Sequence, residues 1–382
     1  MPIVTQESLV DSLNKLPHKS VVITTGGGTG VFQALLSRGN GSNTLLAGYV
    51  PYSEKETIGF LGKTPEKMVS CETARALAMV AYQKALKLKD GDYEVMGVAC
   101  TASLQRVPTE REGRLHTIYV ALQTRNMTHT MSLVIKDSFH TLGLTNLNAI
   151  RAKEEQLAVG MMLNELANGH DLELQVVMDE YAKQDIEYDW FENEKLGDIL
   201  AGKIKYYGFF GDEPIALKDY VDSRTAIFPG SFNPAHEGHR EMMEIIAGKD
   251  CKVIREISLT NVDKPPIDFI SMRNRLMQKG WQEPVLVTNA PTFVDKSRLF
   301  PGARFIVGGD TLIRILNPKY AGEIAHVRAM LEGNNNYFYI FPRGDGKSLG
   351  LWGEGSTVLP GEFIVEPRQY EHVSSTELRK KT

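Results

Sequence analysis

Two histidines three residues apart, His236 and His239, have the types and spacing that best suit catalysis. They close the stretch 230–239 (GSFNPAHEGH), which follows the apolar run 226–228 and precedes an apolar-periodic segment that starts at Met242. This order predicts a buried strand, a turn and a helix. Side chains three apart share one face of a helix, whose N-terminal N–H groups favour a phosphate. The imidazoles could therefore donate hydrogen bonds to a phosphoryl group in a transition state, although a turn with two surface histidines is the simpler alternative.

A second polar cluster lies near the end of the sequence, in the stretch 372–379 (HVSSTELR). Ser374 and Glu377 have the S-x-x-E spacing of a capping box, which explains one hydroxyl without any chemistry. The other polar residues place more hydroxyls and a cation at the same helix start, and they are Ser375, Thr376 and Arg379. Such a helix start suits a β- or γ-phosphate.

Strands and helices alternate between these two stretches, which predicts a Rossmann-like, doubly wound parallel sheet with its ligand at the carboxyl ends of the strands. Lys264 and Arg273 would bring a point charge and a bidentate fork to phosphates near the first crossover. Solvated surface charge is the alternative for both. Asp310 follows Gly308 and Gly309 at a strand end, where a carboxylate accepts hydrogen bonds from ribose hydroxyls or caps a helix.

The two stretches, in this order over about 150 residues, resemble the signatures of the nucleotidylyltransferase superfamily, which includes the nicotinamide and nicotinate mononucleotide adenylyltransferases. Val373 stands where the second signature, I-S-S-T-x-x-R, has Ile. The resemblance implies attack of an acceptor oxygen on the α-phosphorus of ATP or CTP, with release of pyrophosphate. Mg²⁺ would be held mainly by phosphates and water, without a dedicated set of protein ligands.

The resemblance also assigns roles to residues. Those expected in catalysis are His236, His239, Lys264 and Arg379. Those expected to bind the nucleotide are Gly230, Ser231, Phe232, Arg273, Gly308, Asp310, Ser374, Ser375 and Thr376.

The acceptor is less sharply indicated than the reaction. Related adenylyltransferases carry a Trp after the strand that here is 285–287, to grip a nicotinamide ring, whereas this chain has Phe293, out of register. Nicotinamide or nicotinate mononucleotide is the leading acceptor, which would place the protein in NAD biosynthesis. A CTP-dependent transferase acting on a phosphorylated small alcohol is the second candidate. A nucleotide-binding regulator without catalysis is an alternative of another class.

The first half has its own Gly-rich loop, 24–30 (TTGGGTG), between the strand 21–23 and a helical segment. Such a loop can bring N–H groups to a phosphate. It is not a P-loop, because no Lys follows the last Gly, and Gln33 stands where G-x-G-x-x-G has its third Gly. A structural turn is the alternative. Further strands expected at 48–53, 95–100 and 116–122, with a helix at 152–167, predict a layered α/β domain.

Residues 5–168 resemble, in their order of elements and in short motifs, the C-terminal domain of the CinA family, whose active members deamidate nicotinamide mononucleotide. Gly26 falls at the family's nucleophilic Ser, and Thr57 at its Lys. Covalent amide hydrolysis needs a nucleophile and a base, so this half is expected to bind a nucleotide in its loop without deamidating it. A substitute hydroxyl from Thr24, Thr25 or Thr29 would make the protein a bifunctional deamidase and adenylyltransferase.

At 382 residues the chain is expected to form two domains, 1–168 and 223–382. The connector between them, 169–222, is acidic and aromatic and is expected to form amphipathic helices.

The composition limits the partners. A net charge of −4 argues against a general nucleic-acid surface, and no apolar run approaches the ~20 residues of a membrane span. The first residues lack the features of a signal peptide, and Cys71, Cys100 and Cys251 form no C-x-x-C. We therefore expect a cytoplasmic protein whose ligands are small nucleotides, with no nucleic-acid or membrane partner. A homo-oligomer is left open.

Overall fold

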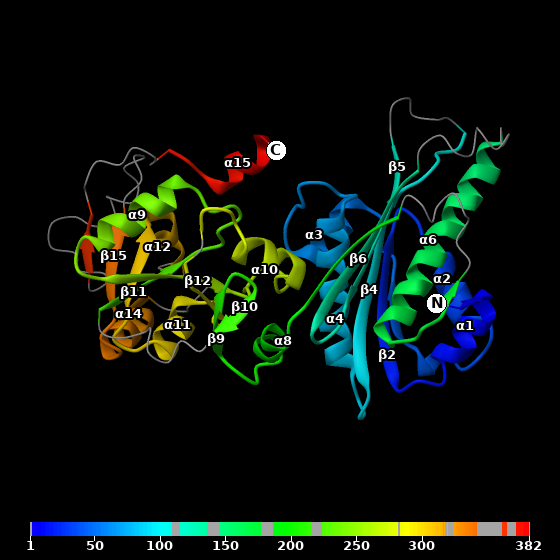
Figure 1. Cartoon of the computed structure of the whole chain (residues 1–382), viewed down its shortest axis with the longest axis horizontal. Helices are drawn as coiled ribbons and strands as arrows, with labels where there is room; N and C mark the ends of the chain where they lie inside the picture. Colours follow the sequence, from blue (N-terminus) through cyan, green and yellow to red (C-terminus); the bar gives the residue numbers. More distant parts are fainter. Residues whose placement is uncertain are drawn as a thin grey trace. The chain divides into compact units, whose positions relative to one another are not determined.

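The computed structural model describes residues 2–108, 115–135, 146–176, 186–215, 224–281, 283–315, 317, 319, 324–341, 361–364 and 372–381. The chain divides into two compact units, each built of helices and sheets (Figure 1). Unit 1 comprises Met1–Gly197 and Asp263–Ser271, and unit 2 comprises Asp198–Val262 and Met272–Thr382. The predicted α/β class is confirmed for both.

Unit 1 is built on a six-stranded sheet with the order β3-β2-β4-β5-β6-β8. The first three strands are parallel, and β4, β5, β6 and β8 pair antiparallel. In sheet order the strands span Leu45–Tyr49, His18–Thr25, Glu94–Ser103, His116–Gln123, Met127–Ile135 and Ile186–Glu192. A separate parallel pair joins β1 (Ile3–Val4) to β7 (Gln175–Val176).

Helices cover both faces of this sheet. On one face lie α3 (Glu54–Leu61) and α4 (Cys71–Leu88), and on the other lie α1 (Gln6–Leu13), α2 (Gly30–Leu36) and α6 (Leu147–Gly169) (Figure 1). A short 3-10 turn, η1, spans Gly41–Asn43. The approach of α4 to β4 depends on Gly97, where a Cβ would lie 2.2 Å from the Ala78 carbonyl oxygen. The backbones of helix and strand therefore pack almost directly on each other.

The start of α4 carries a signal that the sequence prediction did not use. Ser70 and Thr73 do not form a capping box, yet the Ser70 hydroxyl alone accepts a hydrogen bond from the Thr73 N–H, at 3.2 Å. An N-cap serine satisfies one of the free N–H groups of a helix without a reciprocal partner.

The expected connector 169–222 is not a separate segment where the structure describes it. Residues 186–192 form β8, the edge strand of unit 1, and the helical interpretation of 187–192 is wrong. Trp190 lies opposite His129 of β6, and their rings stack with centroids 6.4 Å apart. The alternation of Ile186, Tyr188 and Trp190 has the period of a strand, which outweighs the acids between them. Residues 177–185 and 216–223 lie outside the described part.

Unit 2 contains an eight-stranded sheet with the order β10-β9-β13-β12-β11-β14-β15-β16. The last six strands in this order are parallel, and β9 and β10 extend the sheet antiparallel. In sheet order the strands span Glu213–Ile215, Tyr206–Phe210, Val285–Thr288, Lys252–Ser258, Thr225–Pro229, Arg304–Gly308, Tyr337–Phe341 and Gly361–Phe363. The strand order reverses between β11 and β14. That reversal is the switch point at which doubly wound sheets bind ligands.

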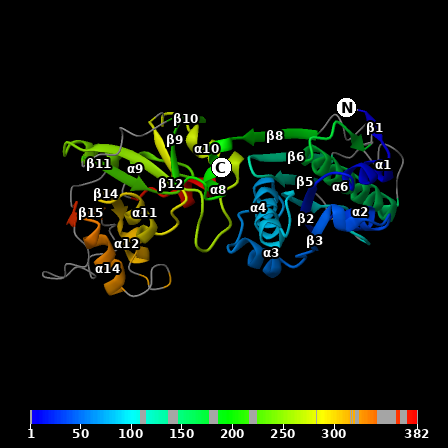
Figure 2. The same ribbon diagram turned by 90° about the horizontal axis from the view of Figure 1, so that it is seen from below.

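The helices of unit 2 pack on both faces of its sheet. On one face lies α9 (Glu237–Ala247), and on the other lie α11 (Phe293–Leu299), α12 (Gly309–Ile315) and α14 (Ile324–Gly333) (Figure 2). The described part of the chain also contains α15 (Ser375–Lys381) in unit 2, and α8 (Glu194–Leu200) and α10 (Phe269–Leu276), whose residues are divided between the two units. Phe305 and Phe338 are fully buried beneath α11, α12 and α14, in one apolar core.

Candidate nucleotide site in unit 2 and pocket in unit 1

The predicted histidine loop follows β11 at the switch point. His236 is the N-cap residue of α9, and its backbone N–H donates to Nδ1 of His239, at 3.2 Å. The two imidazole rings stack with centroids 3.7 Å apart and planes 27° apart. Because Nδ1 of His239 accepts this bond, neutral His239 carries its proton on Nε2. The arrangement thus makes Nε2 the donor nitrogen of that ring.

The loop itself is held by buried aromatic packing. Phe232 is fully buried, and its ring packs at 5.0 Å from His239 and 5.4 Å from Phe228. Its φ of 43° lies in the left-handed region that residues other than glycine rarely adopt. Beneath it lies Arg255, also fully buried, whose guanidinium is 5.5 Å from the Phe232 ring centroid. Burial lowers the pKa of Arg255, with a partly offsetting contribution from Glu283.

Gln278 links both sides of the histidine loop, and sequence reasoning missed it. Its Nε2 donates to the Phe232 carbonyl oxygen at 2.7 Å, and its Oε1 accepts from the Ala235 N–H at 2.6 Å. One amide side chain therefore holds the two ends of the turn 232–235. A lone glutamine just after α10 carries no sequence signal for such a role.

The C-terminal signature meets this loop. The Ser375 hydroxyl donates to the Pro234 carbonyl oxygen at 2.7 Å, and Arg379 donates to the carbonyl oxygen of Asn233. Arg379 also reaches the Thr376 hydroxyl at 3.4 Å. These bonds bring together two stretches that are 141 residues apart in the chain. Because the Ser375 hydroxyl donates its one proton to Pro234, Ser375 joins the two stretches in this structure.

The first of the two hydrogen bonds of the predicted capping box is present at the start of α15. The Ser374 hydroxyl accepts from the Glu377 N–H at 3.2 Å, as a capping serine does.

The other predicted residues divide between the two units. Gly308 ends β14, the neighbour of β11, and Asp310 lies exposed in the first turn of α12. Arg273 is half-buried on α10 and contacts Asn274 at 3.4 Å. Lys264 is exposed, and its segment, 263–271, belongs to unit 1 by its packing. The structure therefore groups the histidine loop with the C-terminal signature, but assigns Lys264 to unit 1.

Phe293, which is out of register with the family's Trp, is partly buried and packs on the core of unit 2. It begins α11, and its ring packs 5.6 Å from Phe305 and 6.1 Å from Phe338. The ring belongs to the core of unit 2, because the out-of-register position faces the sheet.

On the same helix as Phe293, Lys296 forms a buried ion pair that joins α11 to β12. Lys296 Nζ lies 2.8 Å from Glu256 Oε1, and both side chains are almost completely buried. The Thr288 hydroxyl donates to the same carboxylate oxygen at 2.5 Å. A buried charge needs such partners, and these residues fix the strands next to the site.

The Gly-rich loop of unit 1 does not offer the N–H groups that were expected to hold a phosphate. The Glu155 carboxylate, from α6, accepts from the N–H of Gly28 at 2.9 Å and of Gly30 at 3.1 Å. It also accepts from the Thr29 hydroxyl at 3.1 Å. A phosphate bound at the N–H groups of Gly28 and Gly30 would therefore have to replace the Glu155 carboxylate.

Gly26 leaves no room for a nucleophile. Its φ is +82°, and a Cβ there would lie 2.0 Å from the Ala102 carbonyl oxygen. Arg151 of α6 donates to the Gly26 carbonyl oxygen at 3.1 Å and fixes the turn. A Ser at this position would require the backbone to move.

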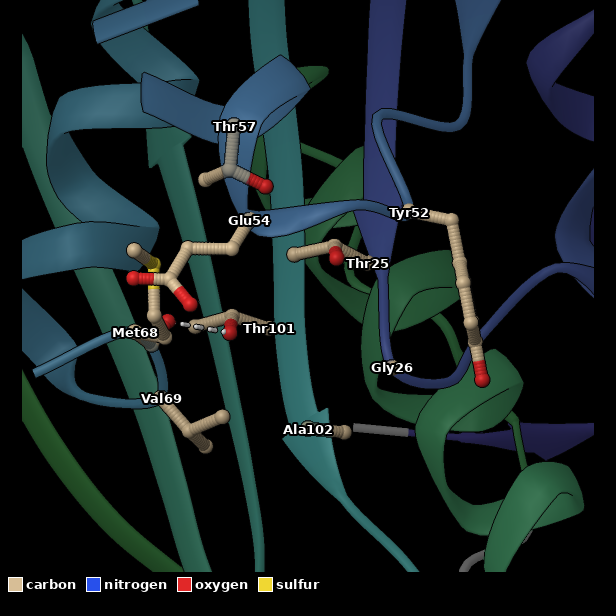
Figure 3. Close-up of a pocket in the computed structure, with 9 residues that line it drawn as sticks. All are labelled: Thr25, Gly26, Tyr52, Glu54, Thr57, Met68, Val69, Thr101 and Ala102. Carbon is tan, nitrogen blue, oxygen red and sulfur yellow. Dashed lines mark hydrogen bonds between the residues drawn. The ribbon is translucent and has the colours of Figure 1, made fainter.

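A pocket of about 290 Å³ opens beside Gly26 in unit 1 (Figure 3). Three threonines from different elements line it, Thr25, Thr57 and Thr101, and Glu54 of α3 adds a carboxylate. Thr25 is the one candidate substitute nucleophile that lines this pocket. Thr24 is buried, with no hydrogen-bond partner for its hydroxyl among the described residues.

Metal ligands and membrane spans were also considered. Within the described ranges, no group of three His, Cys, Asp or Glu side chains could hold a metal ion. No helix in that part of the chain is long and apolar enough to span a bilayer.

No protein-family model matches this chain, and no curated protein matches it. Solved structures of two kinds are similar to it. A CinA-superfamily protein from Escherichia coli is 18% identical over 42% of this chain and 88% of its own, with a TM-score of 0.31. A competence or damage-inducible protein from Enterobacter asburiae is 18% identical, over 43% and 99%, with a TM-score of 0.32. The nicotinic acid mononucleotide adenylyltransferase of Plasmodium falciparum, complexed with NaAD, is 18% identical, over 41% and 82%, with a TM-score of 0.29.

Proposed function

We propose that unit 2 is a nucleotidylyltransferase, which transfers AMP or CMP from a nucleoside triphosphate to a phosphorylated acceptor. One observation carries the proposal. The loop that bears His236 and His239 is hydrogen-bonded to Ser375 and Arg379, at the switch point of a doubly wound sheet. A helix N-terminus, two imidazoles and a guanidinium gathered there suit a triphosphate.

The proposed reaction needs no protein nucleophile. An acceptor oxygen attacks the α-phosphorus, the bond from that phosphorus to the bridging oxygen breaks, and pyrophosphate leaves with its electron pair. His236 and His239 donate to the α-phosphoryl and bridging oxygens, while Thr376 and Arg379 hold the pyrophosphate. Mg²⁺, held mainly by phosphate oxygens and water, would supply positive charge to the triphosphate. Positioning and charge stabilisation then carry the transfer.

Nicotinamide or nicotinate mononucleotide is the proposed acceptor, on the resemblance of both halves of the sequence to proteins of pyridine nucleotide metabolism. The position of Phe293 favours the second candidate, a CTP-dependent transferase acting on a phosphorylated small alcohol. Phe293 is partly buried against Phe305 and Phe338, which leaves less of its ring for stacking on a pyridine.

The deciding experiment measures pyrophosphate. The purified chain is incubated with Mg²⁺ and either ATP or CTP, together with each pyridine mononucleotide or a panel of phosphomonoesters. Pyrophosphate with ATP and a pyridine mononucleotide supports the leading acceptor, and pyrophosphate only with CTP and a phosphorylated alcohol supports the second. If no pair gives pyrophosphate while calorimetry detects nucleotide binding, the chain is a regulator and the proposal fails.

The chemical role of His239 can be separated from its structural role. We expect His239→Ala to lower kcat by ~10²–10³, the usual loss for one charge-stabilising donor. The same change removes the acceptor for the His236 N–H, so α9 should lose about 1 kcal/mol of stability.

His239→Gln is the matched control, because Gln at this position of a helix can still accept that bond. The stability of this variant should be close to that of the wild type, while its kcat should stay as low as that of His239→Ala. Turnover near that of the wild type in both variants would show that the histidine pair is only a turn.

Unit 1 is proposed not to deamidate nicotinamide mononucleotide. Gly26 has neither a side chain nor space for one, and Thr57 cannot act as the cationic partner that a Lys would be. The test is ammonia release by the whole chain, because unit 1 includes β8 and the segment 263–271. Sustained release that disappears in Thr25→Ala would instead establish the bifunctional alternative.

A further inference from the structure

The pocket of unit 1 offers hydrogen-bond acceptors. The Thr57 hydroxyl donates to the Pro51 carbonyl oxygen at 2.8 Å, and the Thr101 hydroxyl donates to that of Met68 at 2.9 Å. A hydroxyl has one proton and two lone pairs, so both threonines present only lone pairs to a ligand. Glu54 adds an ionised carboxylate, which also only accepts. None of the described residues that line the pocket is Lys, Arg or His.

Two N–H groups of the neighbouring loop are already bonded to a carboxylate of the chain. Gly26 lines the pocket, and its loop continues to Gly28 and Gly30, whose N–H groups are bonded to Glu155. A phosphate placed there would have to displace this carboxylate and would also face the charge of Glu54. Like charges at such sites disfavour each other.

The rest of the lining is apolar and aromatic. Met68 and Val69 lie on one side of the pocket, and Ala102 and the exposed ring of Tyr52 lie on the side of the Gly26 turn (Figure 3). Such a pocket pairs an apolar surface for a flat ring with acceptors for hydroxyl groups. Its volume of about 290 Å³ is close to the lower end of small-molecule sites.

We propose that this pocket binds a nucleoside without its phosphate. The base packs against Met68 and Val69, and the sugar hydroxyls donate to Glu54, Thr57 and Thr101. Glu155 serves as an internal substitute for the phosphate and makes the pocket select against nucleotides. The pocket lies in unit 1, so this proposal can be tested independently of the transfer reaction proposed for unit 2.

The test compares nucleosides with their 5′-monophosphates on the full chain. The probes are nicotinamide riboside with nicotinamide mononucleotide, adenosine with AMP, and cytidine with CMP. Hydrogen–deuterium exchange localises binding, because peptides covering 50–58 and 66–73 report on this pocket and peptides covering 230–240 report on unit 2. We expect at least one nucleoside to protect the first set, with its monophosphate binding there at least about tenfold more weakly.

Two variants with matched controls sharpen the test. Glu54→Gln should weaken nucleoside protection, whereas Glu56→Gln, on the same helix turn, should not. Glu155→Ala should raise the affinity of the monophosphate at least about tenfold without a gain for the nucleoside, whereas Gln156→Ala should change neither. Glu155→Gln keeps an acceptor for the loop but removes the charge, so it should also raise the affinity for the monophosphate. It replaces the alanine variant in the test if that variant is unstable.

Three results would overturn the proposal. The first is that no nucleoside protects the 50–58 and 66–73 peptides. The second is a monophosphate that protects them as well as its nucleoside does. The third is selectivity that is unchanged in both Glu155 variants.

Discussion

At the scale of single residues, Gln278 shows how one side chain can set the conformation of the histidine loop. It bonds the Phe232 carbonyl on one side and the Ala235 N–H on the other, across a turn whose first residue has a positive φ. Backbone in that region persists only where neighbouring groups hold it. Gln278 therefore acts through the loop, as a positioning residue for His236 and His239.

We expect Gln278→Met to lower kcat/KM by ~10–100-fold, because small displacements of catalytic groups are costly. Methionine has a similar size but makes neither hydrogen bond. The loss should fall mainly on kcat, since the nucleotide can still bind, and steady-state kinetics with the substrate pair that gives pyrophosphate measures this split. Lys279→Met, at the exposed neighbouring position, is the control. Equal kinetics in both variants would contradict the positioning role.

At the scale of elements, the segment 263–271 is the least expected feature. It follows β12 in the chain and includes the first turn of α10, yet it packs within unit 1. Asp268 forms an ion pair with Arg75 of α4 at 3.0 Å, and both side chains are at least nine-tenths buried. The Phe269 N–H donates to the Thr128 hydroxyl at 2.9 Å. These contacts secure the segment that carries Lys264.

Asp268→Asn should destabilise unit 1 by ~3–5 kcal/mol, because buried Arg75 loses its buried counter-charge and keeps the exposed carboxylate of Glu72, 3.7 Å away. Asparagine can still accept the Ser271 N–H bond that Asp268 now accepts, so the change isolates the charge. Hydrogen exchange of α4 in the full chain measures the effect.

Glu72→Gln is the control for this prediction. Glu72 lies 3.7 Å from Arg75, but its side chain is 74% exposed, so its loss should cost under ~1 kcal/mol. If Asp268→Asn costs no more than Glu72→Gln, the buried pair does not hold the segment.

At the scale of the whole molecule, two units with different cores should respond differently to acid. His170 of unit 1 is buried, and neither ring nitrogen has a hydrogen-bond partner among the described residues. Burial, with a smaller contribution from His18, lowers the pKa of His170 to about 3. The folded state thus binds the proton less readily than the unfolded state, whose pKa is near the ordinary 6.5. The stability that depends on neutral His170 is complete above pH 6.5 and is lost as the pH falls toward 3.

We predict that the free energy of unfolding of unit 1 decreases as the pH is lowered from 6.5. His170 should contribute up to about 1.4 kcal/mol per pH unit to this decrease. Denaturant unfolding at a series of pH values, followed by hydrogen exchange in each unit, measures it. His170→Gln should reduce the slope whatever it does to absolute stability. An unchanged slope would show that His170 is not the titrating group.

His129 should act in the opposite direction. Burial alone would lower its pKa, but the hydrogen bond and charge of Glu165 raise it above 6.5. The stability contributed by this pair is therefore complete below pH 6.5 and is lost as the pH rises through the raised pKa. The two histidines titrate in separate ranges, so the slope on the acid side reports on His170.

Local patterns in the sequence were enough for much of the fold. The strand–turn–helix around His236 and His239, the buried strand ending at Gly308 and the cap at Ser374 depend on residues within a few positions of one another. Apolar period, Gly and Pro positions and N-cap chemistry act over that range. Strand β8 has the same kind of signal in its alternation, but the acids between its apolar residues favour an amphipathic helix equally well.

The tertiary structure alone decided which of these pieces meet. The bond from Ser375 to Pro234 spans 141 residues, and the bond from the Gly28 N–H to Glu155 spans 127. Such pairings depend on how the sheets close and which helix faces which loop, and no local propensity records them. For the same reason the sequence predicted a glycine-rich loop open to phosphate, whereas folding placed the Glu155 carboxylate on its N–H groups. The sequence by itself determined the elements and the residues that could do chemistry. Long-range packing determined their partners, because each hydrogen-bonding group can be satisfied by any suitable group that the fold brings within reach.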